Sequence, residues 1–395
     1  MSDRALILLL AVIVTIGSVA TNIYIPALPA VRAHFGVSVA QAQATFAVAL
    51  VTFAIGMLCW GPISDRYGRR RAILWGVTVM AAGSAIALLS RSIHWLIVGR
   101  AVQAFGTATG IVVARAVISD RFPTETMARM LAQLGVVAVI ASGTAPVFGG
   151  LLTAHFGWRS VFVVLLFVAA AVGWFAWRHL PETRPVTTHP PPPREMVGAA
   201  ATLLRTPLYL SCVLQASAAY GIFVVIISLA PYIMINALGR PPTEYGFYYL
   251  FISVGYLLGN WGVGRFGGRG QRWAIHFGSA LQLGSACVAV ALAVFGVDHP
   301  LAIFAPMGLL FFGQGLFMPH LTAIAVSLAP PRATGVGAST LGFLNQVIAA
   351  GCVQFMGLSE SVSAMPMLVF CVTAAALQFA VLRLSPAMEP AVRPA

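Results

Sequence analysis

The feature that most constrains this chain is the recurrence of apolar runs of about 20 residues, the length that an α-helix needs to cross a bilayer. Because 59% of the 395 residues are hydrophobic and only 8% are charged, a soluble domain of this size is excluded. We therefore expect an all-α membrane protein with twelve transmembrane helices in two pseudo-symmetric six-helix halves. The apolar windows span residues 5–26, 42–62, 72–90, 94–116, 130–152, 159–178, 208–234, 245–264, 274–296, 301–327, 334–357 and 364–384.

A polar interruption separates the sixth window from the seventh. Residues 180–206 include four consecutive prolines at 190–193, and this stretch is too polar and proline-rich to enter a membrane. We interpret it as an extended cytoplasmic linker. The expected organisation is an N-terminal half at 1–179, the linker at 180–206, and a C-terminal half at 207–395.

The charge pattern predicts which side of the membrane each loop occupies. The basic residues are all arginine, and they give a net charge of +13. Most of them fall in loops that would share one side of the membrane, together with both termini and the linker, which the positive-inside rule assigns to the cytoplasm. This placement favours contact with membrane lipid over nucleic-acid binding.

The densest charge cluster lies between the second and third windows, at residues 61–71. We expect Gly61 and Pro62 to end the second helix and Gly68 to allow a tight reversal of the chain. Asp65 would then lie at the carbonyl end of its helix, where the helix dipole disfavours a negative charge. It therefore needs a cation or the N-terminus of another helix as a partner, which makes it a candidate latch.

The pattern G-x-x-x-D-R-x-G-R-R in this cluster resembles the loop motif of the major facilitator superfamily. The alternative is an ordinary basic loop with an incidental aspartate. The resemblance implies a gating latch, with the N-terminus of the eleventh helix as one possible partner for the aspartate. The latch residues would be Gly61, Asp65, Arg66, Gly68, Arg69 and Arg70, with Arg115 and Asp120 from the end of the fourth helix.

The end of the first helix, residues 22–30, is similar to the corresponding stretch of the Bcr/CflA drug exporters, which are bacterial antiporters for chloramphenicol-type and bicyclomycin-type compounds. This resemblance implies a monomeric carrier of small lipophilic drugs in the bacterial inner membrane, with the proton gradient as energy source and no cofactor. Those exporters usually carry an aspartate at the position of Asn22. Arg100, in the fourth helix, resembles the arginine of the superfamily's second motif and would face the central cavity. The family's acid–arginine pair would then become a pair between Asn22 and Arg100.

This substitution matters for coupling because the carboxylates all lie at helix ends or in loops. An asparagine cannot gain and lose a proton. Either another group such as His320 carries the proton, or the chain is impaired, uncoupled or a substituted variant. For His320 the alternative is a hydrogen-bonded histidine near a helix end, and for Arg100 it is an arginine that extends to the interface.

The fifth helix carries a glycine-rich stretch that resembles the antiporter motif G-P-x-x-G-G, with alanine in place of its first glycine. Its residues are Gly143, Pro146, Gly149 and Gly150. The proline removes a backbone hydrogen bond and the glycines permit close helix approach. The motif therefore predicts either a hinge that prevents leak or simple small-residue packing.

A cavity for lipophilic drugs should combine aromatic side chains with a few polar groups. The alternatives within transport are a carrier of an endogenous metabolite, such as a nucleoside or amino-acid derivative, and an uncoupled uniporter. An enzyme is the weakest alternative, because no catalytic cluster or nucleotide-binding loop lies in the sequence. The candidate substrate residues are Tyr24, Phe46, Phe53, Gln103, Gln215, Tyr220, Phe223, Tyr232, Gln314, Asn345 and Gln346.

Overall fold

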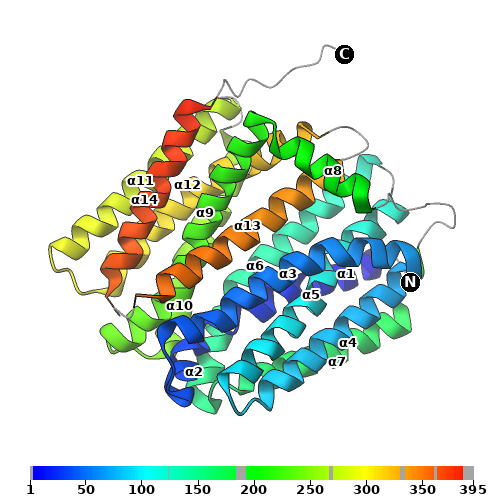
Figure 1. Cartoon of the computed structure of the whole chain (residues 1–395), viewed down its shortest axis with the longest axis horizontal. Coiled ribbons are helices and arrows are strands. Elements are labelled where there is room, and N and C mark those ends of the chain that lie inside the picture. The colour runs from blue at the N-terminus through cyan, green and yellow to red at the C-terminus, as the bar shows by residue number, and fades with distance from the viewer. Residues whose placement is uncertain are drawn as a thin grey trace. The chain divides into compact units, whose positions relative to one another are not determined.

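The computed structural model describes residues 3–122, 124–183, 193–266, 270–329, 334–359 and 363–385. Helices dominate these residues (Figure 1). The chain divides into two compact units, one with residues Met1–Pro190, Ala230–Phe247 and Val353–Glu360, the other with Pro191–Leu229, Tyr248–Cys352 and Ser361–Ala395. We call these unit 1 and unit 2.

The first half of the chain forms α1 to α7, all in unit 1. Ser38 begins α3 with a capping box, since its hydroxyl accepts from the Gln41 N–H and the Gln41 side chain accepts from the Ser38 N–H. The helices are α1 (Asp3–Asn22), the 3₁₀ turn η1 (Ile25–Ala27), α2 (Leu28–Phe35), α3 (Val39–Tyr67), α4 (Arg69–Leu88), α5 (Ile93–Arg121), α6 (Thr124–Phe156) and α7 (Ser160–His179).

Small residues allow α4 and α5 to pack closely along their lengths. A Cβ atom on Gly83 would lie 2.2 Å from the Gln103 nitrogen, and one on Gly106 would lie 2.4 Å from the Met80 nitrogen. Such contacts are typical of membrane helices, which cannot rely on the hydrophobic effect to associate. The close packing holds α5, which carries Arg100, at a fixed position against α4.

The second half forms α8 to α14. Helices α9, α10 and α13 each contribute residues to both units. The helices are α8 (Pro193–Leu204), α9 (Pro207–Tyr232), the π-helical turn η2 (Ile233–Ala237), α10 (Pro242–Arg265), α11 (Gln271–Val294), α12 (Pro300–Ser327), α13 (Thr334–Gly357) and α14 (Ala364–Leu384).

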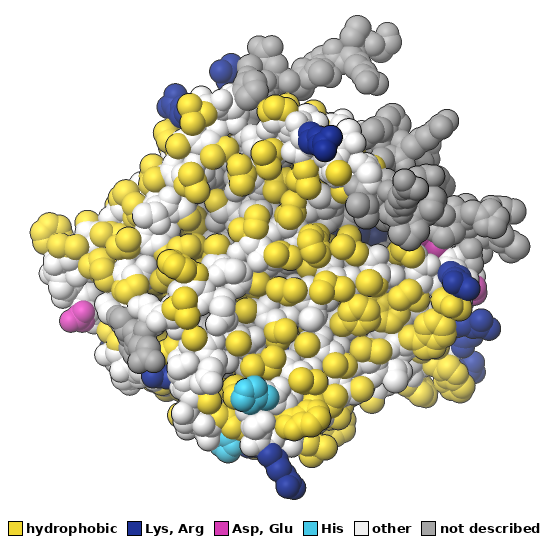
Figure 2. All heavy atoms as spheres, viewed as in Figure 1, with side chains coloured by type: hydrophobic (Ala, Val, Ile, Leu, Met, Phe, Trp, Pro, Cys, Tyr) yellow, Lys and Arg dark blue, Asp and Glu magenta, His cyan; other side chains and the backbone are white. Residues whose placement is uncertain are grey.

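Eleven of the described helices are long and apolar enough to span a membrane, counting α1 with α2 and α9 with η2. Helix α10 occupies the expected eighth window but is less apolar, since it carries several tyrosines, glycines and Asn260. Hydrophobic side chains cover much of the face in Figure 2, which suits a surface in contact with lipid. These features confirm the predicted all-α membrane fold.

The prediction that Gly61 and Pro62 end the second helix is wrong. Pro62 does not end its helix, because α3 continues to Tyr67 with Pro62 inside it. A proline removes one backbone donor, and membrane helices tolerate this where side chains satisfy the freed groups. The carbonyl that loses its donor is that of Leu58, four residues before Pro62, and the helix continues past it to Tyr67. The chain reverses at Gly68, as predicted. The φ of Gly68 is +98°, a value that favours glycine.

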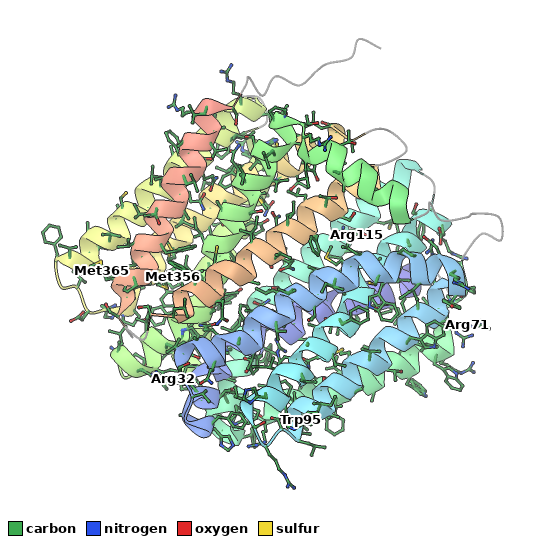
Figure 3. The ribbon with its side chains drawn as sticks, in the orientation of Figure 1. Arg32, Arg71, Trp95, Arg115, Met356 and Met365 are labelled. Atoms are coloured by element: carbon green, nitrogen blue, oxygen red, sulfur yellow. The ribbon has the colours of Figure 1, made fainter. Side chains whose placement is uncertain are left out.

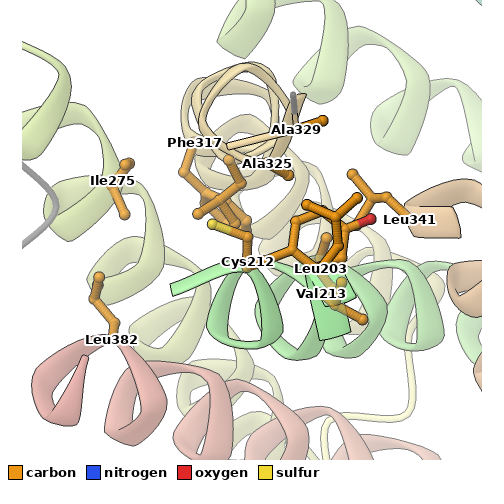
Figure 4. Packing of buried hydrophobic residues seen from close by; sticks show 13 residues of the cluster. Leu203, Cys212, Val213, Ile275, Phe317, Ala325, Ala329, Leu341 and Leu382 are labelled. Atoms are coloured by element: carbon orange, nitrogen blue, oxygen red, sulfur yellow. The ribbon is translucent and has the colours of Figure 1, made fainter. Parts of the chain in front are cut away.

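The stretch expected to be an extended linker contains helix α8. The prolines at 190–192 lie outside the described residues, while α8 begins at Pro193, a position where proline suits a helix start. Leu203 is 4% exposed and belongs to a hydrophobic cluster of unit 2 with side chains from α9, α11, α12, α13 and α14 (Figure 4). The apolar end of α8 is therefore anchored in the core of unit 2.

Candidate functional site

The predicted latch residues meet where α3, α4 and α5 come together. Arg69, the first residue of α4, is 7% exposed. Its guanidinium forms an ion pair with Asp65, and its Nε lies 2.9 Å from Asp120 Oδ2. It also donates to the Ser64 hydroxyl at 2.7 Å. A buried charge is tolerated when paired and hydrogen-bonded, so Arg69 holds the ends of α3 and α5 against the start of α4.

Other residues predicted for this latch lie apart from the Arg69 centre. The Arg66 guanidinium lies 5.3 Å from the ring centroid of Tyr67. Arg70 donates to the Trp177 carbonyl at the end of α7. Arg115 is exposed, and none of the ion pairs between described residues involves it. The structure therefore brings together Asp65, Arg69 and Asp120, whereas Gly61 lies within α3.

A second cluster surrounds Arg100 on α5, whose side chain is only 1% exposed. Its Nη1 donates to the Gln103 side-chain oxygen and to the Ala20 carbonyl, the latter at 3.3 Å. The guanidinium carbon lies 4.4 Å from the centroid of the Tyr24 ring, a cation–π arrangement. Arg100 Nε is buried and has no hydrogen-bond partner. A buried cation is thus surrounded by neutral groups.

Both neutral partners of Arg100 are fixed by further hydroxyl groups. Gln103 donates to the Ser84 hydroxyl on α4 at 2.7 Å. The Tyr24 hydroxyl lies 2.8 Å from the Thr45 hydroxyl on α3. The resulting network connects α4, α5, the end of α1 and α3 inside unit 1. Sequence reasoning missed Ser84 and Thr45, because small hydroxyl residues in apolar helices usually bond to their own backbone.

The predicted pair between Asn22 and Arg100 does not form. Asn22 is 5% exposed, and its amide nitrogen donates to the Ser18 carbonyl at 2.8 Å and to the Ser142 hydroxyl at 2.7 Å. Its amide oxygen is buried without a partner. Arg100 bonds Gln103 on its own helix and the Ala20 carbonyl on α1, whereas Asn22 bonds Ser142 on α6. Ser142 was also missed, although it directly precedes Gly143 of the glycine-rich motif.

The glycine-rich motif of α6 forms a tight seam within unit 1. A Cβ atom on Gly149 would lie 2.1 Å from the Ile23 carbonyl oxygen, and one on Gly150 would lie 2.5 Å from the Pro242 carbonyl oxygen. The Pro146 carbonyl oxygen would lie 2.9 Å from a Cβ atom on Gly246 of α10. At these glycines the backbone of α6 therefore approaches the backbone at the end of α1 and at the start of α10 closely.

Candidate substrate residues of unit 2 gather between α9, α12 and α13. The Tyr220 hydroxyl of α9 lies beside the Gln346 side chain of α13. Ser217 donates to the Asn345 side-chain oxygen at 2.8 Å. Phe223 has its ring centroid 5.9 Å from that of Tyr220 and 5.6 Å from that of Phe311. This cluster has the aromatic and amide character that the sequence predicted.

The remaining candidates are separate from these clusters. Several are buried, with a polar atom that has no partner: Gln215 Oε1, Gln314 Oε1 and the Tyr232 hydroxyl. Phe46 is fully buried in α3, and Phe53 faces Gly17 of α1. His320 is partly buried near the end of α12. Their roles stay predictions.

Comparison with known proteins shows that the chain is similar to transporters. Residues 10–352 match the Major Facilitator Superfamily. Multidrug resistance protein D of Escherichia coli K12 is 28% identical over 349 residues, covering 86% of this chain and 85% of that protein. A chloramphenicol resistance protein of Pseudomonas aeruginosa is 29% identical over 344 residues, covering 83% and 76%. The crystal structure of a bacterial homolog to the human lysosomal transporter Spinster has a TM-score of 0.78 at 17% identity, covering 98% and 100%.

Proposed function

Because the chain belongs to the major facilitator superfamily, we propose that it exports small lipophilic drug-like molecules by alternating access, in exchange for protons. The observation that carries this proposal is the buried network around Arg100. A charged side chain deep in a membrane protein normally faces a transport pathway. Arg100 lies within the membrane-spanning helix α5, with its guanidinium held between α1 and α5.

The relatives support the choice of cargo. A chloramphenicol resistance protein and a multidrug resistance protein each resemble most of this chain at 28–29% identity. We therefore propose amphenicol-type compounds as the first cargo to test. The aromatic and amide groups around Tyr220, Phe223 and Gln346 would supply the apolar walls and polar contacts that such a drug needs.

The charge of the site supports a preference among drugs. Arg100 has no carboxylate partner within the described residues, and Asp65 and Asp120 lie in the last turns of α3 and α5, beside Arg69. A lipophilic cation would therefore be repelled by an uncompensated positive charge, whereas a neutral drug would not be repelled and an anionic drug would be attracted. We propose that neutral and anionic compounds are preferred. Strong export of lipophilic cations, without export of neutral amphenicols, would contradict this preference.

A proton-coupled mechanism needs a group that titrates during transport. Asn22 cannot serve, so we propose His320 of α12 as the group to test first. The carrier would act as a monomer in the bacterial inner membrane with both termini in the cytoplasm, without a cofactor. The test is drug flux into proteoliposomes under an imposed pH gradient, comparing wild type with His320→Gln. If His320 carries the proton, the glutamine variant loses the acceleration by the gradient but keeps exchange of labelled for unlabelled drug.

A second candidate function is uncoupled uniport, and one observation favours it. The position where the resembling exporters carry an acid holds an amide whose nitrogen bonds the Ser18 carbonyl and the Ser142 hydroxyl, neither of which titrates. Flux of chloramphenicol that is unaffected by a pH gradient in wild type would replace antiport with uniport.

A further inference from the structure

Helix α4 has no charged side chain of its own that suits the helix dipole at either end. Gly68 at its N-cap offers no side chain, and the first turn holds Arg69, Arg70 and Arg71, without an acidic residue. The N-terminus of a helix carries partial positive charge and unpaired N–H groups, so three arginines there are unfavourable. The last turn of α4 carries no basic residue to offset the partial negative charge at that end. Figure 3 shows Arg71 near one end of α4 and Trp95, in the next helix, near the other.

Glu182, which follows α7, supplies the missing acid at the start of α4. Its Oε1 accepts from the Arg69 N–H at 2.7 Å, and its Oε2 accepts from the Arg70 N–H at 3.3 Å. These are the first two N–H groups of the helix. Gly68 makes the approach possible, because a Cβ atom there would lie 2.4 Å from Glu182 Oε2. The carboxylate therefore caps α4 from another segment of the chain.

Arg159, which directly precedes α7, does the opposite at the far end of α4. Its Nη2 donates to the Ser90 carbonyl at 3.0 Å, and its Nε donates to the Leu88 carbonyl at 3.3 Å. The guanidinium lies 4.3 Å from the centroid of the Trp158 ring, which limits its freedom. A cation at a helix C-terminus is favourable. The two charges that flank α7 thus complement both ends of α4, and the two helices pack along their lengths.

We propose that Glu182 is a positioning residue for the Arg69 latch and that Arg159 and Glu182 together clamp α4 onto α7. Arg69 connects the two functions, since its N–H binds Glu182 while its side chain binds Asp65 and Asp120. Glu182 fixes the backbone from which that side chain reaches both carboxylates. The expected effect on transport rests on the proposed function. The expected effect on thermal stability follows from the contact alone and does not rest on that function.

The decisive experiment is a double-mutant cycle between Glu182→Gln and Asp120→Asn, read out as drug turnover in proteoliposomes and as thermal unfolding in detergent. Glu244→Gln is the matched control, because Glu244 pairs only loosely with Arg240, at 3.9 Å on the surface. We expect Glu182→Gln to lower turnover about tenfold with little change in KM, as the loss of a charge-assisted hydrogen bond predicts. The Glu182→Gln/Asp120→Asn variant should be no slower than Asp120→Asn alone, because both act through Arg69.

The Arg159 end provides an independent comparison. Arg159→Gln should lower the unfolding temperature more than Arg91→Gln, an exposed arginine at the same end of α4, and its effect on turnover should add to that of Asp120→Asn. Additive effects of Glu182→Gln and Asp120→Asn, in turnover and in unfolding, would overturn the positioning role. An unfolding temperature for Glu182→Gln equal to that for Glu244→Gln would overturn the clamp. If wild type moves no drug, the unfolding cycle still decides this proposal while the proposed function fails.

Discussion

At the scale of single residues, the structure gives Arg100 a different amide partner from the one that the sequence predicted. Gln103 accepts a hydrogen bond from Arg100, whereas Asn22 bonds Ser18 and Ser142. Arg100 therefore keeps its charge deep in unit 1 through neutral contacts. Asn22 holds α1 against α6 beside the glycine-rich motif.

Asn22→Asp tests whether an acid at position 22 makes drug transport depend on protonation. The neutral acid fits as the amide does, whereas the ionised form places a second oxygen against the Ser18 carbonyl, which lies 2.8 Å from the present nitrogen. We expect drug flux through the variant to match wild type at acidic pH and to fall as pH rises, beyond any pH dependence of wild type. Initial rates over a pH series would show this. Asn22→Ser, which does not titrate in that range, is the control and should follow the wild-type profile; an Asp profile that also follows it would contradict the prediction.

At the scale of elements, close helix contacts depend on glycines that the sequence could identify but not assign to partners. The motif around Pro146 predicted close packing, yet only the structure shows that Gly149 meets the chain after α1 and that Gly150 meets the start of α10. The partner helix of a small residue is a long-range property and leaves no local pattern. The same reason explains why the ends of α4 could not be assigned to Arg159 and Glu182.

Gly149→Ala tests this seam, with Gly135→Ala on the same helix as a matched control. A methyl group at position 149 would lie 2.1 Å from the Ile23 carbonyl oxygen, while nothing lies within 4 Å of one at position 135. We expect Gly149→Ala to destabilise the protein by about 1–3 kcal/mol, as overpacking does. Gly135→Ala should be neutral or slightly stabilising, since alanine favours helix more than glycine does. Thermal unfolding in detergent measures both, and equal unfolding temperatures for the two variants would refute the seam.

At the scale of the whole molecule, the fold could be predicted from the sequence because a bilayer allows few solutions. Apolar windows of spanning length and the loop motif at residues 61–71 were enough to predict an all-α transporter. The errors arose where proline chemistry was read locally, at Pro62 inside α3 and at Pro193 opening α8. For the site, the sequence identified residues of unusual chemistry, such as Arg69, Arg100 and Asn22. It did not identify their hydrogen-bond partners, because these lie on other helices.

We propose that drug export depends on the Arg100 network, and transport by Arg100 variants tests this dependence. Chloramphenicol transport would be followed in proteoliposomes under an imposed pH gradient, with wild type, Arg100→Gln and, as a charge-matched control, Arg91→Gln. We expect drug flux through wild type and through Arg91→Gln to be faster than drug flux into protein-free liposomes. Arg100→Gln should be slower by about tenfold or more, since a hydrogen bond to a charged group contributes about 1.5–3 kcal/mol. Wild-type flux equal to that of protein-free liposomes would contradict drug export by this chain. Undiminished flux through Arg100→Gln would contradict its dependence on the Arg100 network.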